Sequence, residues 1–211
     1  MNILLLGGSP AAASSTGRLL DHVAARAAER LADDAAEHRF TRVPVRELPA
    51  HALLHADTGD LAIKRALGAV ADADAVIVAT PVYKASYTGL LKAFLDLLPQ
   101  DGLAGKLVLP LATGGSQSHM LALDYALRPV LQALDARHVL AGIYATSAQL
   151  VWSEAGGLVV DPAVAWRVQA GVDALAAGLH GQQAWRDLQA RADDRCAAPG
   201  TTPGAALRLA R

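Results

Sequence analysis

The stretch DAVIVATPVYKASYTG, from Asp74 to Gly89, decides the fold expected for this chain. Val76, Ile77 and Val78 are apolar and β-branched without alternation, which predicts a strand covered on both faces, as in a parallel sheet flanked by helices. A polar and aromatic loop follows, and the segment LLKAFLDLL after it is typical of a helix. Open α/β sheets build ligand crevices at the carboxyl ends of their strands, so we expect this loop to face a site.

Length and composition predict a single globular domain. The chain has 211 residues, enough to bury a sizeable core. Its 19 basic and 20 acidic residues leave a net charge of −1, so no overall field recruits nucleic acid or an anionic membrane. The apolar runs stop short of the ~18 to 20 residues that a membrane span requires. We therefore expect neither nucleic acid nor a membrane as a partner.

The two ends of the chain differ in composition. The N-terminal segment MNILLLGGSP lacks the basic start of a signal peptide and meets glycine after a few residues, which favours a strand in a cytoplasmic protein. Few large apolar residues follow Gln183, which predicts one domain over residues 1–182 and a flexible or disordered tail over residues 183–211. The single cysteine, Cys196, lies in this tail and excludes an internal disulfide framework.

The first predicted strand, Asn2 to Leu6, also leads into a small polar loop. The loop begins with GGSP, and Ser14, Ser15 and Thr16 open a helical pattern after it. Hydroxyl groups beside the unpaired N–H groups of a helix N-terminus make a phosphate site without net positive charge. The alternative is that Ser14 or Ser15 only caps the helix. Neither G-x-G-x-x-G nor G-K-[ST] is present, so a monophosphate fits better than a dinucleotide or a nucleoside triphosphate.

A third predicted strand, Lys106 to Thr113, ends in Gly114, Gly115 and Ser116. The carboxyl ends of parallel strands share one edge of a sheet. We therefore expect the hydroxyl loop near Ser14, the PVYKASYTG loop and the TGGSQSH loop to converge on one site.

The remaining predicted elements fill in the sheet and its helices. Phe40 to Val45 can form a strand, the segment up to Gly59 is expected to be a loop, and Asp60 is expected to cap a helix that reaches about Ala73. His51 and His55 lie four residues apart within that loop. We discount a metal site there, because no third ligand lies nearby.

The C-terminal third predicts one more central strand, a hairpin and a helix. Val139 to Ala145 is the strand, and LVWSEAGGLVV, Leu150 to Val160, is a hairpin turning at Gly156 and Gly157. Pro162 starts a last helix that runs to about Leu179.

The helical segment His119 to Ala136 contains Pro129. A proline cannot donate to the carbonyl four residues back, here that of Tyr125, so the helix must kink or bulge around that residue. Such irregularities, π-bulges especially, often lie at functional positions. The alternative is that Tyr125 is a core aromatic residue beside a proline kink.

These motifs resemble those of the NAD(P)H-dependent FMN reductases of the flavodoxin-like superfamily, and within it the reductases that serve alkanesulfonate monooxygenases. GGSP with SST, ATPVYKASYTGLLKAFLDLLP and LPLATGGSQSHMLALDYALRPVLQAL match that group in order and spacing. The resemblance covers roughly residues 2 to 150. It implies a doubly wound five-stranded parallel sheet of order 2-1-3-4-5, with helices on both faces.

The resemblance also implies the site residues. The phosphate loop would be formed around Ser9, Ser14, Ser15 and Thr16. The two loops beside the isoalloxazine ring would contribute Pro81, Val82, Tyr83, Lys84, Ser86 and Tyr87 on one side and Thr113, Gly114, Gly115 and Ser116 on the other. Tyr125, with Pro129, corresponds to a π-helix at a tetramer interface.

Several of these positions carry an alternative. Relatives often have arginines in the phosphate loop where this chain has Ala11 and Ser15, and Arg18 is the candidate to replace them. Lys84 is either a positive charge near flavin N1 or a solvated lysine on a loop. His119 either contacts flavin or nicotinamide, or is a capping or packing group at the start of a helix.

The implied chemistry is hydride transfer from NADPH, or from NADH, to N5 of FMN, which needs no catalytic side chain and no metal. The first hypothesis is a reductase that supplies FMNH2 to an FMN-dependent monooxygenase, in alkanesulfonate sulfur acquisition. The second is a flavin-bound quinone or azo reductase. The third is a flavodoxin-like electron carrier without enzymatic activity, against which the near-neutral charge argues.

Overall fold

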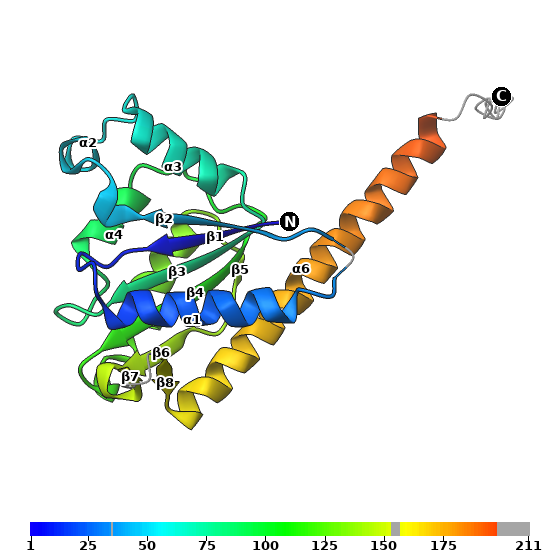
Figure 1. Ribbon diagram of the computed structural model, residues 1–211. Helices are drawn as coiled ribbons and strands as arrows, with labels where there is room; N and C mark the ends of the chain where they lie inside the picture. Colours follow the sequence, from blue (N-terminus) through cyan, green and yellow to red (C-terminus); the bar gives the residue numbers. More distant parts are fainter. Residues whose placement is uncertain (35, 153–156, 198–211) are drawn as a thin grey trace, which may run out of the picture. The chain divides into compact units, whose positions relative to one another are not determined.

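A parallel β-sheet forms the centre of the computed structural model, which describes residues 1–34, 36–152 and 157–197 (Figure 1). Its strands are β1 (Asn2–Gly7), β2 (Arg39–Pro44), β3 (Ala75–Pro81), β4 (Leu107–Gly114), β5 (His138–Val139) and β6 (Ile143–Thr146). The order is β2-β1-β3-β4-β5, and β6 also pairs with β4. Every pairing in this sheet is parallel. The predicted order 2-1-3-4-5 is therefore confirmed.

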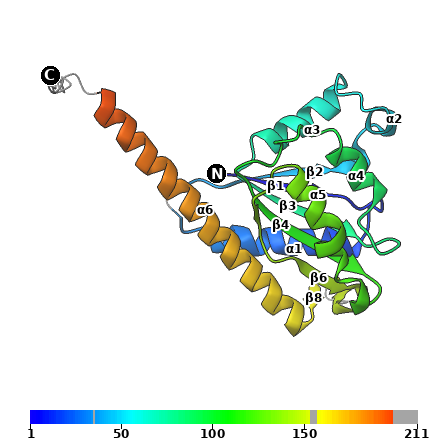
Figure 2. The same cartoon turned by 180° about the vertical axis from the view of Figure 1, so that it is seen from behind.

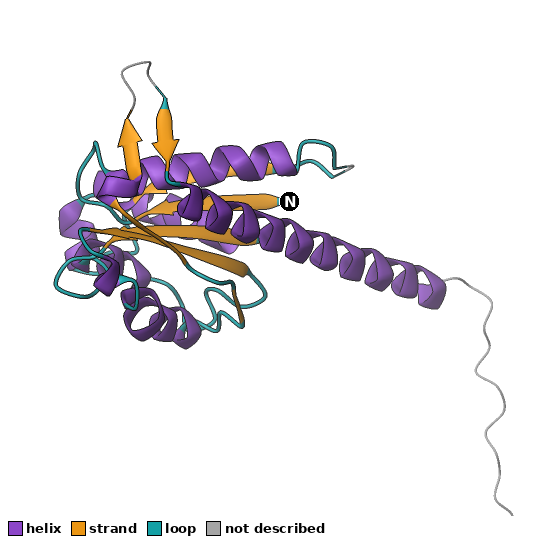
Figure 3. Cartoon of the chain, turned by 90° about the horizontal axis from the view of Figure 1, so that it is seen from below, coloured by secondary structure: helices purple, strands orange, loops and turns teal. Residues whose placement is uncertain are grey.

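Helices cover both faces of the sheet, as Figures 2 and 3 show. They are α1 (Ser15–Arg30), α2 (Ala50–Leu54), α3 (Leu61–Ala71), α4 (Gly89–Leu95), α5 (Arg128–Ala133) and α6 (Pro162–Ala197). Helix α1 and the part of α6 up to Leu179 pack on one face, and α2 to α5 pack on the other. All seven residues of β3 are buried. This is the two-sided burial that the run of β-branched residues predicts.

Alternation along the strands divides the core into two layers. Leu4, Val76 and Val78 point to the layer under α3 and α4, where Phe94 is fully buried. Leu5 and Ile77 point to the layer under α1. Each such side chain contributes about 1.5 to 3 kcal/mol by leaving water. The sheet is therefore held from both sides, and its carboxyl edge is a rigid base for loops.

Residue contacts divide the chain into two units, Met1–Leu179 and His180–Arg211. The first contains the sheet and all the loops that follow its strands. In the second, the described residues are helical to Ala197, beyond the predicted helix end near Leu179. The physical reason is intrinsic propensity, because Ala, Arg, Gln and Leu are strong helix formers even without a core to bury. The division at residue 182 stays a prediction, and residues 198–211 lie outside the described part.

Two further predictions need correction or completion, and a third is confirmed. The predicted loop around His51 contains a short helix, α2, which buries Ala52 and Leu53. The predicted hairpin is present as β7 (Leu150–Trp152) paired with β8 (Leu158–Val160), while residues 153–156 of its turn lie outside the described part. The predicted cap is confirmed, since the Asp60 carboxylate accepts from the first-turn amides of α3.

The predicted last strand is split into β5 and β6. The interruption lies opposite the irregular helix: a Cβ on Gly142 would come 2.8 Å from Leu123 Cδ1. The guanidinium of Arg128 donates to the carbonyls of Val139 (3.0 Å) and Leu140 (3.1 Å). The Leu140 amide still donates to the Val108 carbonyl of β4 at 2.8 Å, and the packing and arginine contacts hold the irregular segment that follows it.

The predicted irregularity at Tyr125 is confirmed as a π-helix, Leu123–Leu127, which leads directly into α5. Pro129 is the second residue of α5, directly after the π-helix, and its missing N–H accounts for the break in regular helical bonding around Tyr125. The side chain of Tyr125 is 79% exposed, so it is not a core aromatic residue. The alternative of a core role is excluded.

Candidate functional site

The loop after β1 ends in the N-terminus of α1. Ser14 is the N-cap, and its Oγ accepts from the amide of Gly17 at 3.0 Å. The amide of Arg18 bonds to the Ser14 carbonyl at 3.1 Å. Among the described residues, no protein acceptor bonds to the amides of Ser15 and Thr16, as expected in the first turn of a helix. Capping and anion binding are therefore compatible, because they use different N–H groups.

A buried hydroxyl pair joins this loop to the strand two places along the sheet. Thr16 Oγ1 and Thr113 Oγ1 are 2.6 Å apart, and both residues are buried. A buried hydroxyl without a hydrogen-bond partner lowers the stability of the fold, and each of these two hydroxyls is the partner of the other. This bond fixes the start of α1 against the end of β4.

The loop after β3 is anchored at both ends by threonines. Thr88 Oγ1 donates to the Gly8 carbonyl at 2.7 Å and accepts from the Leu91 amide at 3.1 Å, so it caps α4 and holds the loop after β1. Thr80 Oγ1 accepts from the Thr88 amide at 3.1 Å. The Val82 amide donates to the Thr113 carbonyl at 2.7 Å. All three loops are therefore linked at their bases by short bonds.

The tip of this loop is a tight turn. Tyr83 and Ser86 exchange both backbone hydrogen bonds, at 2.8 and 3.1 Å. Between them Lys84 (φ 50°) and Ala85 (φ 60°) are both in the left-handed region. Two such residues define a type I′ turn, in which a non-glycine residue costs about 1 kcal/mol or more. The loop thus holds Tyr83 at the cost of local backbone strain.

The loop after β4 is shaped by a residue from another strand. Tyr144, on β6, donates its hydroxyl to the Ser116 carbonyl at 2.6 Å. A Cβ at Gly114 would lie 2.3 Å from the Tyr144 Oη, so any larger residue there requires the tyrosine to move. Burial raises the pKa of Tyr144, which keeps the hydroxyl protonated as a donor. Gln117 Nε2 adds a bond to Gln149 Oε1 at 3.0 Å.

The three loops enclose a hollow of about 210 Å³ at the carboxyl edge of the sheet. Its lining comprises Ser9, Ala11, Ser14, Ser15, Thr16, Pro81, Val82, Tyr83, Thr113, Gly114, Gly115 and Ser147. The predicted convergence of the loops is therefore observed. It lies where the strand order turns from β1–β2 to β3–β4, the switch point of an open α/β sheet.

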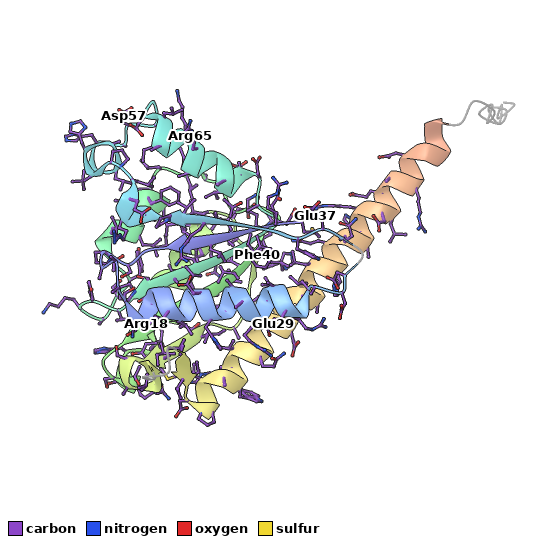
Figure 4. The ribbon with its side chains drawn as sticks, viewed as in Figure 1. Arg18, Glu29, Glu37, Phe40, Asp57 and Arg65 are labelled. Carbon is purple, nitrogen blue, oxygen red and sulfur yellow. The ribbon has the colours of Figure 1, made fainter. Side chains whose placement is uncertain are left out.

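Several predicted site residues do not line this hollow. They are Arg18, Lys84, Ser86, Tyr87, Ser116 and His119. Arg18 lies on α1, labelled in Figure 4, and lines a different hollow with Asp21, His22 and Leu158. The Ser116 carbonyl accepts from the Tyr144 hydroxyl, and the backbone of Ser86 bonds to that of Tyr83. Both residues therefore hold the shape of their loops. Tyr87 packs against the core, and burial raises its pKa.

Sequence reasoning placed Ala11 in the phosphate loop, but it missed Ser147 in the lining and the residues that hold the loops, Thr80, Thr88 and Tyr144. Thr88 is an N-cap immediately before a helical run, a signal that was present in the sequence. Tyr144 carries no local signal, because its partner is 28 residues away along the chain.

The lining fits a flavin mononucleotide. It contains no charged side chain, and its phosphate end offers the hydroxyls of Ser9 and Ser14 with the first-turn amides of α1. Such a helix terminus attracts a phosphate. The other end is made of Pro81, Val82 and Tyr83 against Thr113 and the glycines, which suits a flat aromatic ring. A Cβ on Gly115 would meet no protein atom within 4 Å, so this lining stays open to a ligand.

Comparison with known proteins agrees with this arrangement. Residues 1–150 match the NADPH-dependent FMN reductase family. The chain belongs to this family. It is therefore an NAD(P)H-dependent FMN reductase, an oxidoreductase whose cofactors are FMN and a reduced nicotinamide. The resemblance drawn from the sequence motifs is confirmed.

Individual relatives span most of the same region. An FMN reductase (NADPH) of Pseudomonas putida is 47% identical over 154 residues, covering 73% of this chain and 75% of the relative. The FMN reductase (NADPH) of Escherichia coli is 42% identical, covering 72% and 76%. The NADH-dependent FMN reductase SfnE of Pseudomonas putida is 34% identical, covering 71% and 79%.

Solved structures confirm the flavodoxin-like fold. The apo crystal structure of the NADH:FMN oxidoreductase EMOB is 43% identical, with a TM-score of 0.73, covering 82% of this chain and 87% of that one. An FMN-dependent NADH-azoreductase of Bacillus anthracis has a TM-score of 0.54 at 12% identity, which shows a shared fold alone. In the described part of this chain, no helix has the length and apolar content needed to span a bilayer.

Proposed function

We propose that this reductase takes free FMN as a substrate and releases FMNH2 to a separate FMN-dependent monooxygenase, in alkanesulfonate sulfur acquisition. The observation that carries the proposal is the uncharged lining of the hollow, which includes no lysine or arginine. Without an ion pair to its phosphate, bound flavin forgoes charge-assisted hydrogen bonds worth about 1.5 to 3 kcal/mol each. Modest affinity suits an enzyme that must let its product go. The sulfonate context rests on the motif resemblance.

Each loop has a defined task in this proposal. Ser9, Ser14, Ser15 and the buried Thr16 form the phosphate end. FMN, when bound, supplies the hydride acceptor at N5. Pro81 to Tyr83 and Thr113 to Gly115 place the ring against the nicotinamide, and no protein side chain need gain or lose a proton. Tyr83 is 53% exposed, and its ring is available to border the nicotinamide.

The test is steady-state oxidation of NADPH and of NADH by the purified protein across a series of added FMN. A rate that rises with free FMN and saturates supports a flavin substrate. Copurifying stoichiometric flavin with turnover that depends on added quinone, and not on FMN, would support the quinone reductase instead. If the protein oxidises neither NADPH nor NADH, the result would favour the electron-carrier hypothesis.

Transfer of the product is tested separately. The reductase and the monooxygenase are compared in one solution and on opposite sides of a dialysis membrane that FMN can cross. If transfer requires contact between the two proteins, the monooxygenase reaction should stop when the membrane separates them. Turnover that continues across the membrane shows release of free FMNH2. No oxygenation under either condition, with FMN reduction intact, would contradict the monooxygenase role and leave the reductase activity standing.

The π-helix supports a proposal about assembly. Met120, Leu121 and Tyr125 are 51%, 51% and 79% exposed on one short segment beside the loop after β4. We propose that this segment, with Pro129 fixing its irregularity, forms the interface of a homotetramer. Tyr125→Ala is then expected to lower the mass measured by light scattering, or to alter flavin retention, with little change in unfolding. Unchanged mass, flavin affinity and reductase rate would contradict the proposal.

A further inference from the structure

A hollow of about 310 Å³ lies between α3 and the first residues of β1 and β2. Its strand wall includes Asn2 and Leu4 from β1, with Arg39 and Thr41 from β2. These residues lie at the amino ends of the strands, whereas the flavin loops follow the carboxyl ends. The hollow is therefore separate from the flavin site and lies at the opposite edge of the sheet.

The strand wall of this hollow is set by the pairing of β1 with β2. Asn2 lies opposite Arg39, and Leu4 lies opposite Thr41. Side chains alternate along a strand, so these four residues share the face on which Leu4 joins the core layer under α3. Asn2 also connects this wall to the helix, because its Nδ2 donates to the Asp72 carbonyl at 3.0 Å. The wall is therefore fixed by backbone pairing and by a contact to the end of α3.

The helix wall is one face of α3. It carries Arg65, Gly68 and Ala69, with Asp72 at the C-cap. Residues three, four and seven positions apart share a helix face, so these four residues face β1 and β2 together. Between its two charged residues this wall has only a glycine and an alanine. Such small residues leave the space between the helix and the sheet unfilled.

Two arginines line the hollow, one from each wall. Among the described residues, no carboxylate lies within 4.0 Å of the Arg39 or Arg65 guanidinium, and neither guanidinium donates to a protein acceptor. By contrast, Arg42 on β2 pairs with Asp21. A guanidinium offers five N–H donors and binds oxyanions in a bidentate manner. Two like charges in one hollow repel each other, so an anion between them interacts favourably with both.

Gly68 supplies an independent observation. It lies in the interior of α3, where glycine is less favourable than alanine. A Cβ at Gly68 would meet no atom within 4 Å, and its φ is not positive, so neither packing nor backbone geometry requires glycine there. Close approach of a ligand to the helix backbone explains the glycine, because a side chain would occupy the space that the ligand needs.

We propose that this hollow binds a small tetrahedral dianion, sulfate or phosphate. Arg39 and Arg65 hold its oxygens from the two walls, and Gly68 lets the ion lie against the backbone of α3. Asp72 also lines the hollow, and its carboxylate opposes the ion and limits its affinity. The net charge of −1 gives the chain no general attraction for anions, so binding depends on these local residues.

Calorimetric titration of the purified protein with sodium sulfate tests the site, because sulfate keeps both charges throughout the neutral pH range. Saturating FMN fills the phosphate loop at the other edge of the sheet, and sodium chloride keeps the ionic strength constant. We expect saturable binding of one sulfate. Arg39→Ala and Arg65→Ala should each weaken it about tenfold, because charge-assisted hydrogen bonds are lost. Asp72→Asn should strengthen it about threefold, because it removes the opposing charge.

Sodium phosphate is titrated in the same way, and its affinity relative to sulfate shows which of the two ions the site prefers. Saturable binding of either ion with the same dependence on Arg39 and Arg65 supports the site.

Lys64→Ala is the matched control. Lys64 is exposed and immediately precedes Arg65, which is labelled on α3 in Figure 4, but it does not line the hollow. Its removal changes the net charge by the same amount in the same helix, so the affinity for sulfate should stay within about twofold. Equal weakening by Lys64→Ala and Arg65→Ala would reduce the effect to net charge and overturn the inference.

Gly68→Ala separates ion binding from folding. Alanine favours the helix and meets no atom here, so the midpoint of urea unfolding without sulfate should rise. The added methyl group occupies the space where the ion approaches α3, so sulfate should bind about fivefold more weakly or worse. A glycine with a purely structural role would change the stability and leave the affinity for sulfate as it is.

Three results would contradict the proposal. The wild-type protein would show no saturable binding of sulfate or phosphate, or the binding would disappear when FMN is added, which would assign the ion to the phosphate loop. A higher urea midpoint in Gly68→Ala with unchanged affinity for sulfate would show that the ion does not lie against α3, and it would overturn the proposal as well.

Discussion

The loops after β3 and β4 face each other across the same hollow, yet they are shaped in different ways. The tip of the loop after β3 is shaped by its own backbone, with Tyr83 and Ser86 paired around a turn of two left-handed residues. The loop after β4 is shaped from outside, by the Tyr144 hydroxyl on the Ser116 carbonyl and by Gln149. One loop stores strain in itself, and the other depends on a neighbouring strand.

This difference predicts how each loop responds to mutation. A change at the tip of the loop after β3, at Lys84 or Ala85, alters only local strain, so its effect on stability should be modest. A change at the contact between β4 and β6 removes a fixed neighbour, so its effects should reach the fold.

Gly114→Ala should be the most damaging substitution in either loop. The added Cβ would lie 2.3 Å from the Tyr144 Oη, so the tyrosine must move and its bond to Ser116 must break. We expect a loss of about 2 to 3 kcal/mol, as for overpacking plus a lost hydrogen bond. The loss is measured as the difference in the free energy of unfolding in urea between the variant and the wild type.

Gly115→Ala is the matched control for that variant. A Cβ at Gly115 meets no atom within 4 Å, so stability should change by less than about 0.5 kcal/mol while flavin binding weakens. Similar losses of stability at both glycines would show that the loop after β4 is not held by Tyr144.

Thr88→Val tests the anchor of the loop after β3. The substitution keeps the shape and removes the hydroxyl that caps α4 and bonds to Gly8. We expect a loss of about 1 to 2 kcal/mol, the usual cost of losing a cap and leaving a buried carbonyl without its donor. Thr88→Ser keeps the hydroxyl and should recover most of the loss. Equal stability of Thr88→Val and Thr88→Ser would show that the Thr88 hydroxyl does not anchor the loop.

The buried strand β3 and the irregularity around Tyr125 were predicted from local signals, whereas the sheet order was implied by the resemblance of the motifs to a known family. The run around Ile77 reports a buried strand, and Pro129 reports a helix that cannot continue regularly. The extended helix beyond Leu179 was missed because a weak amphipathic pattern gave no reason for it, although its residues favour helix.

The supporting contacts of the site could not be predicted in the same way. The Thr16 and Thr113 hydroxyls meet across 97 residues of chain, and such a pair has no periodicity or spacing to reveal it. Lys84 was a candidate charge near the flavin by analogy, yet its backbone forms the tip of a turn outside the lining of the hollow. Motifs therefore located the loops, and long-range packing decided which side chains within them reach the site.

Tyr144→Phe should have a smaller effect than Gly114→Ala, because it removes the hydroxyl without adding an atom. We expect a loss of about 1 kcal/mol at neutral pH, with weaker flavin binding. Burial raises the pKa of Tyr144 above the usual value near 10, so its contribution is complete below about pH 10 and is lost as the pH rises through the folded pKa.

The free energy of unfolding, measured as a function of pH above neutrality, tests this direction. Wild-type stability should fall more steeply above about pH 10 than that of Tyr144→Phe. A smaller fall should remain in the variant, because burial also raises the pKa of Tyr87. Identical curves for the two proteins would mean that Tyr144 does not titrate with folding.

Ala85→Gly should give the smallest change, and in the opposite direction. Ala85 has a φ of 60°, where glycine fits without the steric penalty of a Cβ. Relief of that penalty outweighs the added entropy of the unfolded chain, so we expect a gain of about 0.5 to 1 kcal/mol. Ala93→Gly, in the interior of α4, is the control and should lose about 1 kcal/mol. A gain in stability that also lowers flavin affinity would show that the strained turn holds Tyr83 for the flavin, whereas a loss at both alanines would show that the turn carries no strain to release.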